Sequence, residues 1–157
     1  MPYPAAENPA AAQTPAAENP RAKSLAARSQ AGRNQYVKNR AATATPAQLV
    51  AMLFDGVIAS LRRAAEAETS GRRAEASEQL VRAQRIVTEL RCSLNFEAGS
   101  LASDLDRIYE FVWRQLVTAN VTRDPLLVMR CLELILPLQE AWSEACLGQA
   151  QPQRLIA

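Results

Sequence analysis

The 157-residue sequence contains no histidine, only three cysteines and few aromatic residues. Without histidine, the chain lacks the usual general base of a serine or cysteine hydrolase and the commonest ligand for zinc or iron. Cys92, Cys131 and Cys146 are odd in number and form no CxxC pair, so they predict neither a zinc site nor a disulfide framework. They are typical of buried structural thiols in a reducing compartment.

Other patterns are missing as well. No run of about 18 apolar residues could span a membrane, and the N-terminus lacks the compact apolar segment of a secretion signal. There is no glycine-rich phosphate loop. Asp106 and Glu110 are four residues apart, but no Glu-x-x-His pair accompanies them, which argues against a di-iron site. We therefore expect a cytoplasmic protein with no membrane insertion, no catalytic residues, no metal and no cofactor.

The charge is distributed unevenly along the chain. Residues 1–40 carry six Lys/Arg against two Glu, whereas residues 41–157 carry twelve Arg against fourteen Asp/Glu. The part that we expect to fold is therefore slightly acidic, which argues against a dedicated nucleic-acid binder.

Both ends of the chain differ in composition from its centre. Residues 1–33 are rich in Ala and Pro, with the repeat PAAENP at 4–9 and 15–20, and predict a disordered extension that cannot bury a core. Residues 34–44 predict a short helix or arm. The last residues, 148–157, predict a flexible tail.

Between these ends, the pattern predicts four long helices at about 45–69, 72–93, 98–119 and 124–147. Thr45 and Pro46, followed by a Gln at the third helical position, predict a capping box, and Asp124 before a Pro predicts a second cap. Asn120 is expected to close the third helix. Long helices with short connections predict an all-α domain over residues 34–147, an antiparallel four-helix bundle with a short N-terminal helix or arm.

The first and last of these helices carry more apolar surface than a bundle normally needs. Large apolar residues of helix 45–69 spread over roughly 240° of the wheel, against the roughly 100–140° that a bundle covers. Helix 124–147 has a second apolar flank at Met129, Leu132 and Leu136. The surplus is covered either by a partner or an N-terminal arm, or by deeper burial within the bundle, and the sequence leaves both open.

An Asp and a Gly stand side by side within the apolar run of helix 45–69. Asp55 lies on the narrow polar strip of this helix, so we expect it at the surface. Gly56 is expected to face the bundle, where a missing side chain lets a neighbouring helix approach closely and offsets the low helix propensity of glycine.

The segment Thr43–Ala67, TATPAQLVAMLFDGVIASLRRAAEA, resembles the first long helix of the flagellin-specific export chaperones, the FliS family. That family typically has Thr-Ala-Ser-Pro followed by a Leu-Tyr/Phe-Asp-Gly core. Further similar segments follow in the same order, namely AQRIVTELRCSLNFEAG at 83–99, LDRIYEFVWRQLVTAN at 105–120, RDP at 123–125 and LPLQEAW at 136–142.

The resemblance implies a cytoplasmic chaperone that binds the C-terminal segment of flagellin, prevents its premature polymerisation and delivers it to the flagellar type III export apparatus. It implies that a short N-terminal stretch covers part of the binding surface when flagellin is absent. The flagellar export gate is a second partner to be expected, and the chain itself is expected to be a monomer or a weak homodimer. A generic helical interaction or dimerisation module is the alternative.

On this basis we assign candidate residues. The predicted flagellin contacts are Tyr36, Val50, Phe54, Ile58, Leu61, Phe111, Met129, Leu132 and Leu136. The predicted structural motif comprises Thr45, Pro46, Asp55, Gly56, Tyr109, Asn120, Asp124 and Trp142.

Overall fold

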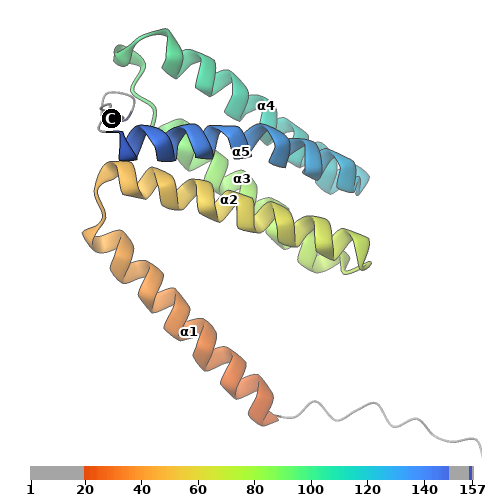
Figure 1. Cartoon of the computed structure of the whole chain (residues 1–157). Coiled ribbons are helices and arrows are strands. Elements are labelled where there is room, and N and C mark those ends of the chain that lie inside the picture. The colour runs from red at the N-terminus through yellow and green to blue at the C-terminus, as the bar shows by residue number, and fades with distance from the viewer. Residues whose placement is uncertain (1–19, 149–155, 157) are drawn as a thin grey trace, which may run out of the picture. The chain divides into compact units, whose positions relative to one another are not determined.

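The computed structural model describes the backbone of residues 20–148 and of Ile156, and side chains from residue 27 onward. The elements are α1 (Pro20–Thr43), α2 (Pro46–Thr69), α3 (Arg73–Cys92), a 3-10 turn (Phe96–Ala98), α4 (Ser100–Thr122) and α5 (Pro125–Leu147) (Figure 1). Apart from turns and one isolated bridge, the described residues are helical, which confirms the all-α prediction.

Helices α2 to α5 form the predicted antiparallel four-helix bundle (Figure 1). α2 packs against α3 and α5, and α4 packs against the same two helices, so the four helices enclose one core. At one end of the bundle, Nε1 of Trp142 on α5 donates a hydrogen bond to the carbonyl oxygen of Ala47 on α2, at 3.1 Å. This bond joins the last helix of the bundle, α5, to its first, α2.

Local sequence signals start the helices as predicted. The Thr45 hydroxyl accepts a hydrogen bond from the backbone N–H of Gln48 at 3.2 Å, and the Gln48 side chain accepts one from the backbone N–H of Thr45 at 2.9 Å. Pro46 occupies the first turn, where its missing N–H costs nothing. The Asp124 carboxylate accepts from the backbone N–H of Leu126 at 2.9 Å and starts α5. The predicted caps at Thr45 and Asp124 are confirmed.

The predicted end of α4 at Asn120 is wrong. The helix continues to Thr122, and Arg123 adopts the left-handed conformation, with φ 57° and ψ 44°. Its backbone N–H donates to the carbonyl of Ala119 at 2.8 Å, which closes the last turn. Asn is common at the C-terminal end of helices, but a helix ends only where the backbone leaves the helical conformation. In α4 that happens at Arg123, three residues after Asn120.

The N-terminal boundary also differs from the prediction. Residues 20–33 are helical and form the first part of α1, whereas the sequence predicts disorder up to residue 33. No proline lies between Pro20 and the end of α1, and its many Ala, Arg, Lys and Gln residues favour a helix. Residues 1–19 lie outside the described residues. The compact unit that contains the bundle begins at Thr43 rather than at residue 34.

The Asp-Gly pair of α2 lies as predicted. Asp55 is exposed. A Cβ atom at Gly56 would lie 3.2 Å from Cδ1 of Ile86 on α3, which is closer than an ordinary contact of about 3.5–4.0 Å between carbon atoms. The absent side chain at Gly56 therefore sets how closely α2 and α3 approach.

Tyr109 and Trp142 are both part of the core. The Tyr109 ring lies against Phe54, with 6.4 Å between the ring centroids and a tilt of 55°. Aromatic pairs prefer such tilted arrangements over face-to-face stacking.

Candidate functional site

Most of the predicted flagellin contacts are core residues. The structure buries these side chains at exposures of 0–7%: Val50, Phe54, Ile58, Leu61 and Leu132. The expectation that they are open to a partner needs correction, because α2 packs against α3 on one side and α5 on the other and so uses most of its wide apolar arc. For these residues, deeper burial within the bundle is the alternative that the structure supports.

Two of the predicted contact residues are exposed on the bundle. Phe111 on α4 is 52% exposed and Met129 on α5 is 47% exposed. Leu136 on α5 is half-buried and packs against the core. Exposed large apolar side chains on a folded domain indicate an interaction surface when several occur on neighbouring elements.

Tyr36 belongs to α1, which lies in a compact unit separate from the one that contains the bundle. Its side chain is 63% exposed, and the Arg40 guanidinium lies 5.8 Å from the ring centroid. Arg40 is one turn further along the same helix, so this cation–π contact is local to α1. The predicted arm is thus a helical segment whose aromatic residue is accessible.

A groove lies where the start of α2 meets the end of α3, and we call it the α2–α3 groove. It has a volume of about 280 Å³ and is lined by Pro46, Leu49, Val50, Leu53, Glu89, Cys92, Ser93 and Ile156. The α2 side is entirely apolar, whereas Glu89 contributes a carboxylate from α3. Val50 is therefore a predicted contact residue that reaches a surface hollow despite its low exposure.

Ile156 contributes to this groove from the C-terminal end of the chain. Its side chain is 8% exposed, and its backbone forms an antiparallel bridge with Leu94, just after α3 ends. The sequence predicts a flexible tail over residues 148–157. The structure instead includes Ile156 in the core cluster. The remainder of that segment, 149–155 and 157, lies outside the described residues. The available signal was the adjacent pair Leu155 and Ile156 within an otherwise polar and small-residue tail.

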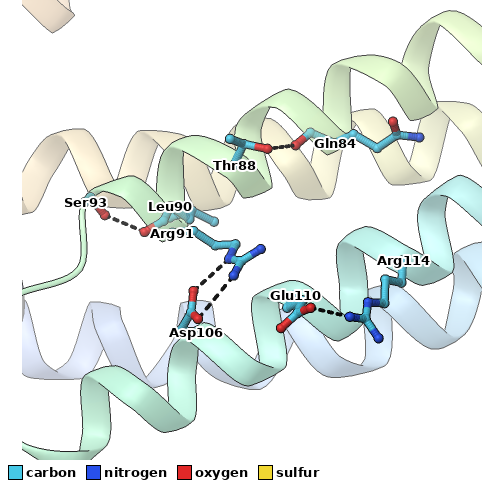
Figure 2. Close-up of polar contacts among 8 residues, drawn as sticks. All are labelled: Gln84, Thr88, Leu90, Arg91, Ser93, Asp106, Glu110 and Arg114. Atoms are coloured by element: carbon cyan, nitrogen blue, oxygen red, sulfur yellow. Dashed lines mark hydrogen bonds and ion pairs between the residues drawn. The ribbon is translucent and has the colours of Figure 1, made fainter. Parts of the chain in front are cut away.

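A second hollow of about 360 Å³ lies on the other side of the end of α3, and Cys92 lines both hollows. Here Arg91 on α3 donates two hydrogen bonds to the Asp106 carboxylate on α4, at 2.7 and 3.2 Å (Figure 2). The hydrogen bonds that Arg91 donates to Asp106 raise the pKa of the Arg91 guanidinium, which is charged at any ordinary pH. This bidentate pair holds α3 and α4 together beside the hollow.

The carboxylates of α4 are paired with arginines. Asp106 binds Arg91, and Glu110 binds Arg114 one turn along the same helix (Figure 2). Asp104 lies 3.9 Å from Arg107. Within the described residues, no group of three Cys, Asp or Glu side chains could hold a metal ion. These carboxylates therefore act as ordinary ion-pair partners.

The three cysteines differ in burial. Cys131 is fully buried, and burial raises the pKa of its thiol to about 12, so it is neutral at physiological pH. Cys92 and Cys146 are exposed, which corrects the expectation that all three thiols are buried. Burial likewise raises the pKa of the Tyr109 phenol to about 12.

Comparisons with known proteins agree with this architecture. Residues 29–150 match the family described as flagellar protein FliS. The flagellar secretion chaperone FliS of Bacillus subtilis (strain 168) is 31% identical over 110 residues, covering 70% of this chain and 82% of that protein. The flagellar secretion chaperone FliS of Vibrio cholerae is 31% identical over 109 residues, covering 69% and 80%.

A solved structure described as a flagellar chaperone from bacteria has the same fold. It superimposes with a TM-score of 0.62 at 21% identity, covering 76% of this chain and 98% of the other. Among the described helices, none is long and apolar enough to cross a membrane. The family match spans the bundle from the start of α2 to the end of α5, and each of the two relatives covers about 70% of the chain at 31% identity, so the chain belongs to the FliS family of flagellar secretion chaperones, which is not a class of enzymes.

Proposed function

We propose that this protein binds the C-terminal segment of flagellin in the cytoplasm, keeps it from polymerising early and delivers it to the flagellar type III export apparatus. The observation that carries the proposal is the match to the family over residues 29–150. The flagellar export gate is the second partner in this proposal, reached by the loaded chaperone.

The distribution of apolar surface supports binding of a polypeptide. The α2–α3 groove offers Leu49, which is 38% exposed, next to Val50 and Leu53. Phe111 and Met129 offer exposed apolar side chains on α4 and α5. A polypeptide segment without stable structure of its own can wrap around a large surface when it binds. Such a segment could bury these separate apolar sites at the same time.

The proposed contact set changes accordingly. Val50, Phe111, Met129 and Leu136 remain proposed flagellin contacts on the bundle, and Tyr36 remains one on α1. The core residues Phe54, Ile58, Leu61 and Leu132 support the contact surface from below, because their side chains fix the positions of the helices that carry it.

Calorimetry with the last ~40 residues of the flagellin encoded in the same genome tests the proposal; that length suffices for two helices and a connection. We expect one-to-one binding at micromolar concentration or below. Phe111→Asp and Leu49→Asp should each weaken binding at least tenfold, because the first places a charge on a proposed contact and the second places one on the apolar wall of the α2–α3 groove. Val121→Asp is the matched control, since Val121 is 78% exposed on α4 and is not a proposed contact. No heat of binding with the unsubstituted protein would end the proposal.

Light scattering separates this function from a dimerisation module. A chaperone should remain a monomer or a weak dimer and form a one-to-one complex with the flagellin segment. A stable dimer that excludes the flagellin segment would favour self-association through the same exposed residues, Phe111 and Met129.

A further inference from the structure

The end of this chain occupies part of its own apolar groove. Ile156 lines the α2–α3 groove together with residues of α2, and only 8% of it is exposed. It follows the last residue of α5, Leu147, by only nine positions, and α5 ends at the same end of the bundle at which α2 begins (Figure 1). Only eight residues of sequence therefore separate α5 from an aliphatic side chain that lies at a surface a partner could use.

The backbone of Ile156 is paired with the bundle in the way that a β-strand is paired with its neighbour. Its backbone pairs in antiparallel fashion with Leu94, which follows the cap of α3 at Ser93 and precedes the 3-10 turn. The bridge thus places extended backbone beside an apolar hollow, while the N–H of Leu94 itself donates to the carbonyl oxygen of Arg91 at 3.2 Å. This combination is the arrangement by which proteins bind extended peptides: main-chain pairing gives affinity, and a pocket selects the side chain.

The groove is not filled by Ile156. About 280 Å³ remains, walled by Leu49, Val50 and Leu53 on α2 and by the end of α3. Glu89 places a negative charge at this surface, which favours a neutral or basic segment over an acidic one. The space and the chemistry suit a second aliphatic side chain on an extended strand.

We propose that Ile156 is a removable plug: it occupies the α2–α3 groove in the free protein, and an extended aliphatic stretch of the flagellin segment replaces it on binding. The identity of the incoming strand rests on the proposed function. The plug is removable because, among the described residues, one side chain and one bridge hold it, and a single buried aliphatic side chain biases an equilibrium by about 10- to 100-fold. A bound chaperone would then differ from a free one in the position of its own C-terminus.

A reversible lock tests both halves of this proposal. Leu94 and Ile156 are directly opposite in the bridge, where Cα atoms of an antiparallel pair lie about 4.5–5.5 Å apart, within the range that a disulfide spans. The full chain with Leu94→Cys and Ile156→Cys, and with Cys92→Ser and Cys146→Ser to remove the exposed thiols, should form this disulfide readily. Circular dichroism checks that the helices are kept, and the reduced form of the same chain is the internal control.

We expect the oxidised chain to bind the flagellin segment at least tenfold more weakly than the reduced chain, with full recovery after reduction. Failure of the disulfide to form would overturn the placement of Ile156 in the groove. Equal binding by the oxidised and reduced forms would overturn the replacement of the plug by flagellin.

Releasing the plug should have the opposite effect. Ile156→Asp should bind the flagellin segment about tenfold more tightly. An Asp side chain should not occupy the apolar groove, so it no longer competes with flagellin for that site. Leu147→Asp, at a residue that is 86% exposed, is the matched control and should leave binding unchanged. Weaker binding by Ile156→Asp would overturn competition and make Ile156 part of the binding surface.

These measurements also separate the two proposals. If no form of the protein binds flagellin, the proposed function fails, and so does the identity given to the incoming strand. The disulfide yield would still establish whether Ile156 occupies the groove, because it is measured without any partner.

Discussion

Substitution of Gly56 by alanine tests how closely α2 and α3 are packed. In an open helix, Gly→Ala stabilises by about 1 kcal/mol through helix propensity alone. Here the new Cβ would meet Cδ1 of Ile86 at 3.2 Å, so the Ile86 side chain must shift. Displacing a side chain from its preferred rotamer costs about 0.5–1.5 kcal/mol. The two effects oppose each other, and we expect Gly56→Ala to change the free energy of unfolding by less than about 0.5 kcal/mol.

Ile86→Val removes the obstructing methyl group and so separates the two effects. By itself it should cost about 0.5–1.5 kcal/mol as a core truncation. In that background, Gly56→Ala should recover most of its helix gain of about 1 kcal/mol, which gives a coupling of roughly 0.5–1.5 kcal/mol between the positions. Urea unfolding of the four proteins, followed by circular dichroism at fixed pH, measures the cycle.

Ala59→Gly is the control for this cycle. Ala59 is exposed on the same helix, so its replacement should cost about 1 kcal/mol with either residue at position 86. A coupling of zero between Gly56 and Ile86 would refute the argument that this glycine is required for close approach to α3.

Three further substitutions or conditions have definite expected outcomes. Ile58→Asp should abolish the helical circular dichroism signal rather than weaken partner binding selectively, because Ile58 is 7% exposed and a buried carboxylate costs several kcal/mol; a folded Ile58→Asp protein would contradict its core position. Trp142→Phe should lower the free energy of unfolding by about 1–2 kcal/mol through loss of the hydrogen bond to Ala47, whereas Trp113→Phe should have little effect. Burial raises the folded-state pKa of Cys131 to about 12, so its contribution to stability is complete below about pH 8.5, the pKa of an unfolded thiol, and is lost as the pH rises. By pH 10.5 the loss should be ~2.7 kcal/mol, and a Cys131→Ala protein should show a shallower decline in urea unfolding.

Local sequence signals predicted the helices of the bundle well. A capping box at Thr45 and an Asp-Pro pair at Asp124 act within a few residues, so the sequence contains everything that these caps need. The end of α4 was predicted less well, because Asn120 has the right chemistry but the backbone turns at Arg123. A left-handed conformation at an arginine has no local sequence signal.

The candidate site was harder to predict, because burial depends on all four helices together. The wide apolar arc of α2 suggested an open surface, but Phe54 and Leu61 are covered by its two neighbours. Helical wheels show which side chains share a face and give no information on how many neighbours a helix has. The position of Ile156 depends on a contact with Leu94, 62 residues earlier in the chain, and no periodic pattern could reveal it.

The bond between Trp142 and Ala47 has a consequence for synthesis on the ribosome. It joins residues 95 positions apart, and α5 ends 78 residues after α2 does. At about 5–20 residues per second, α5 is complete roughly 4–16 s after α2. During that interval, the side of α2 that α5 will cover has no partner in its own chain. The nascent protein is therefore an incomplete bundle with an open apolar face for several seconds, until α5 is complete and closes the bundle.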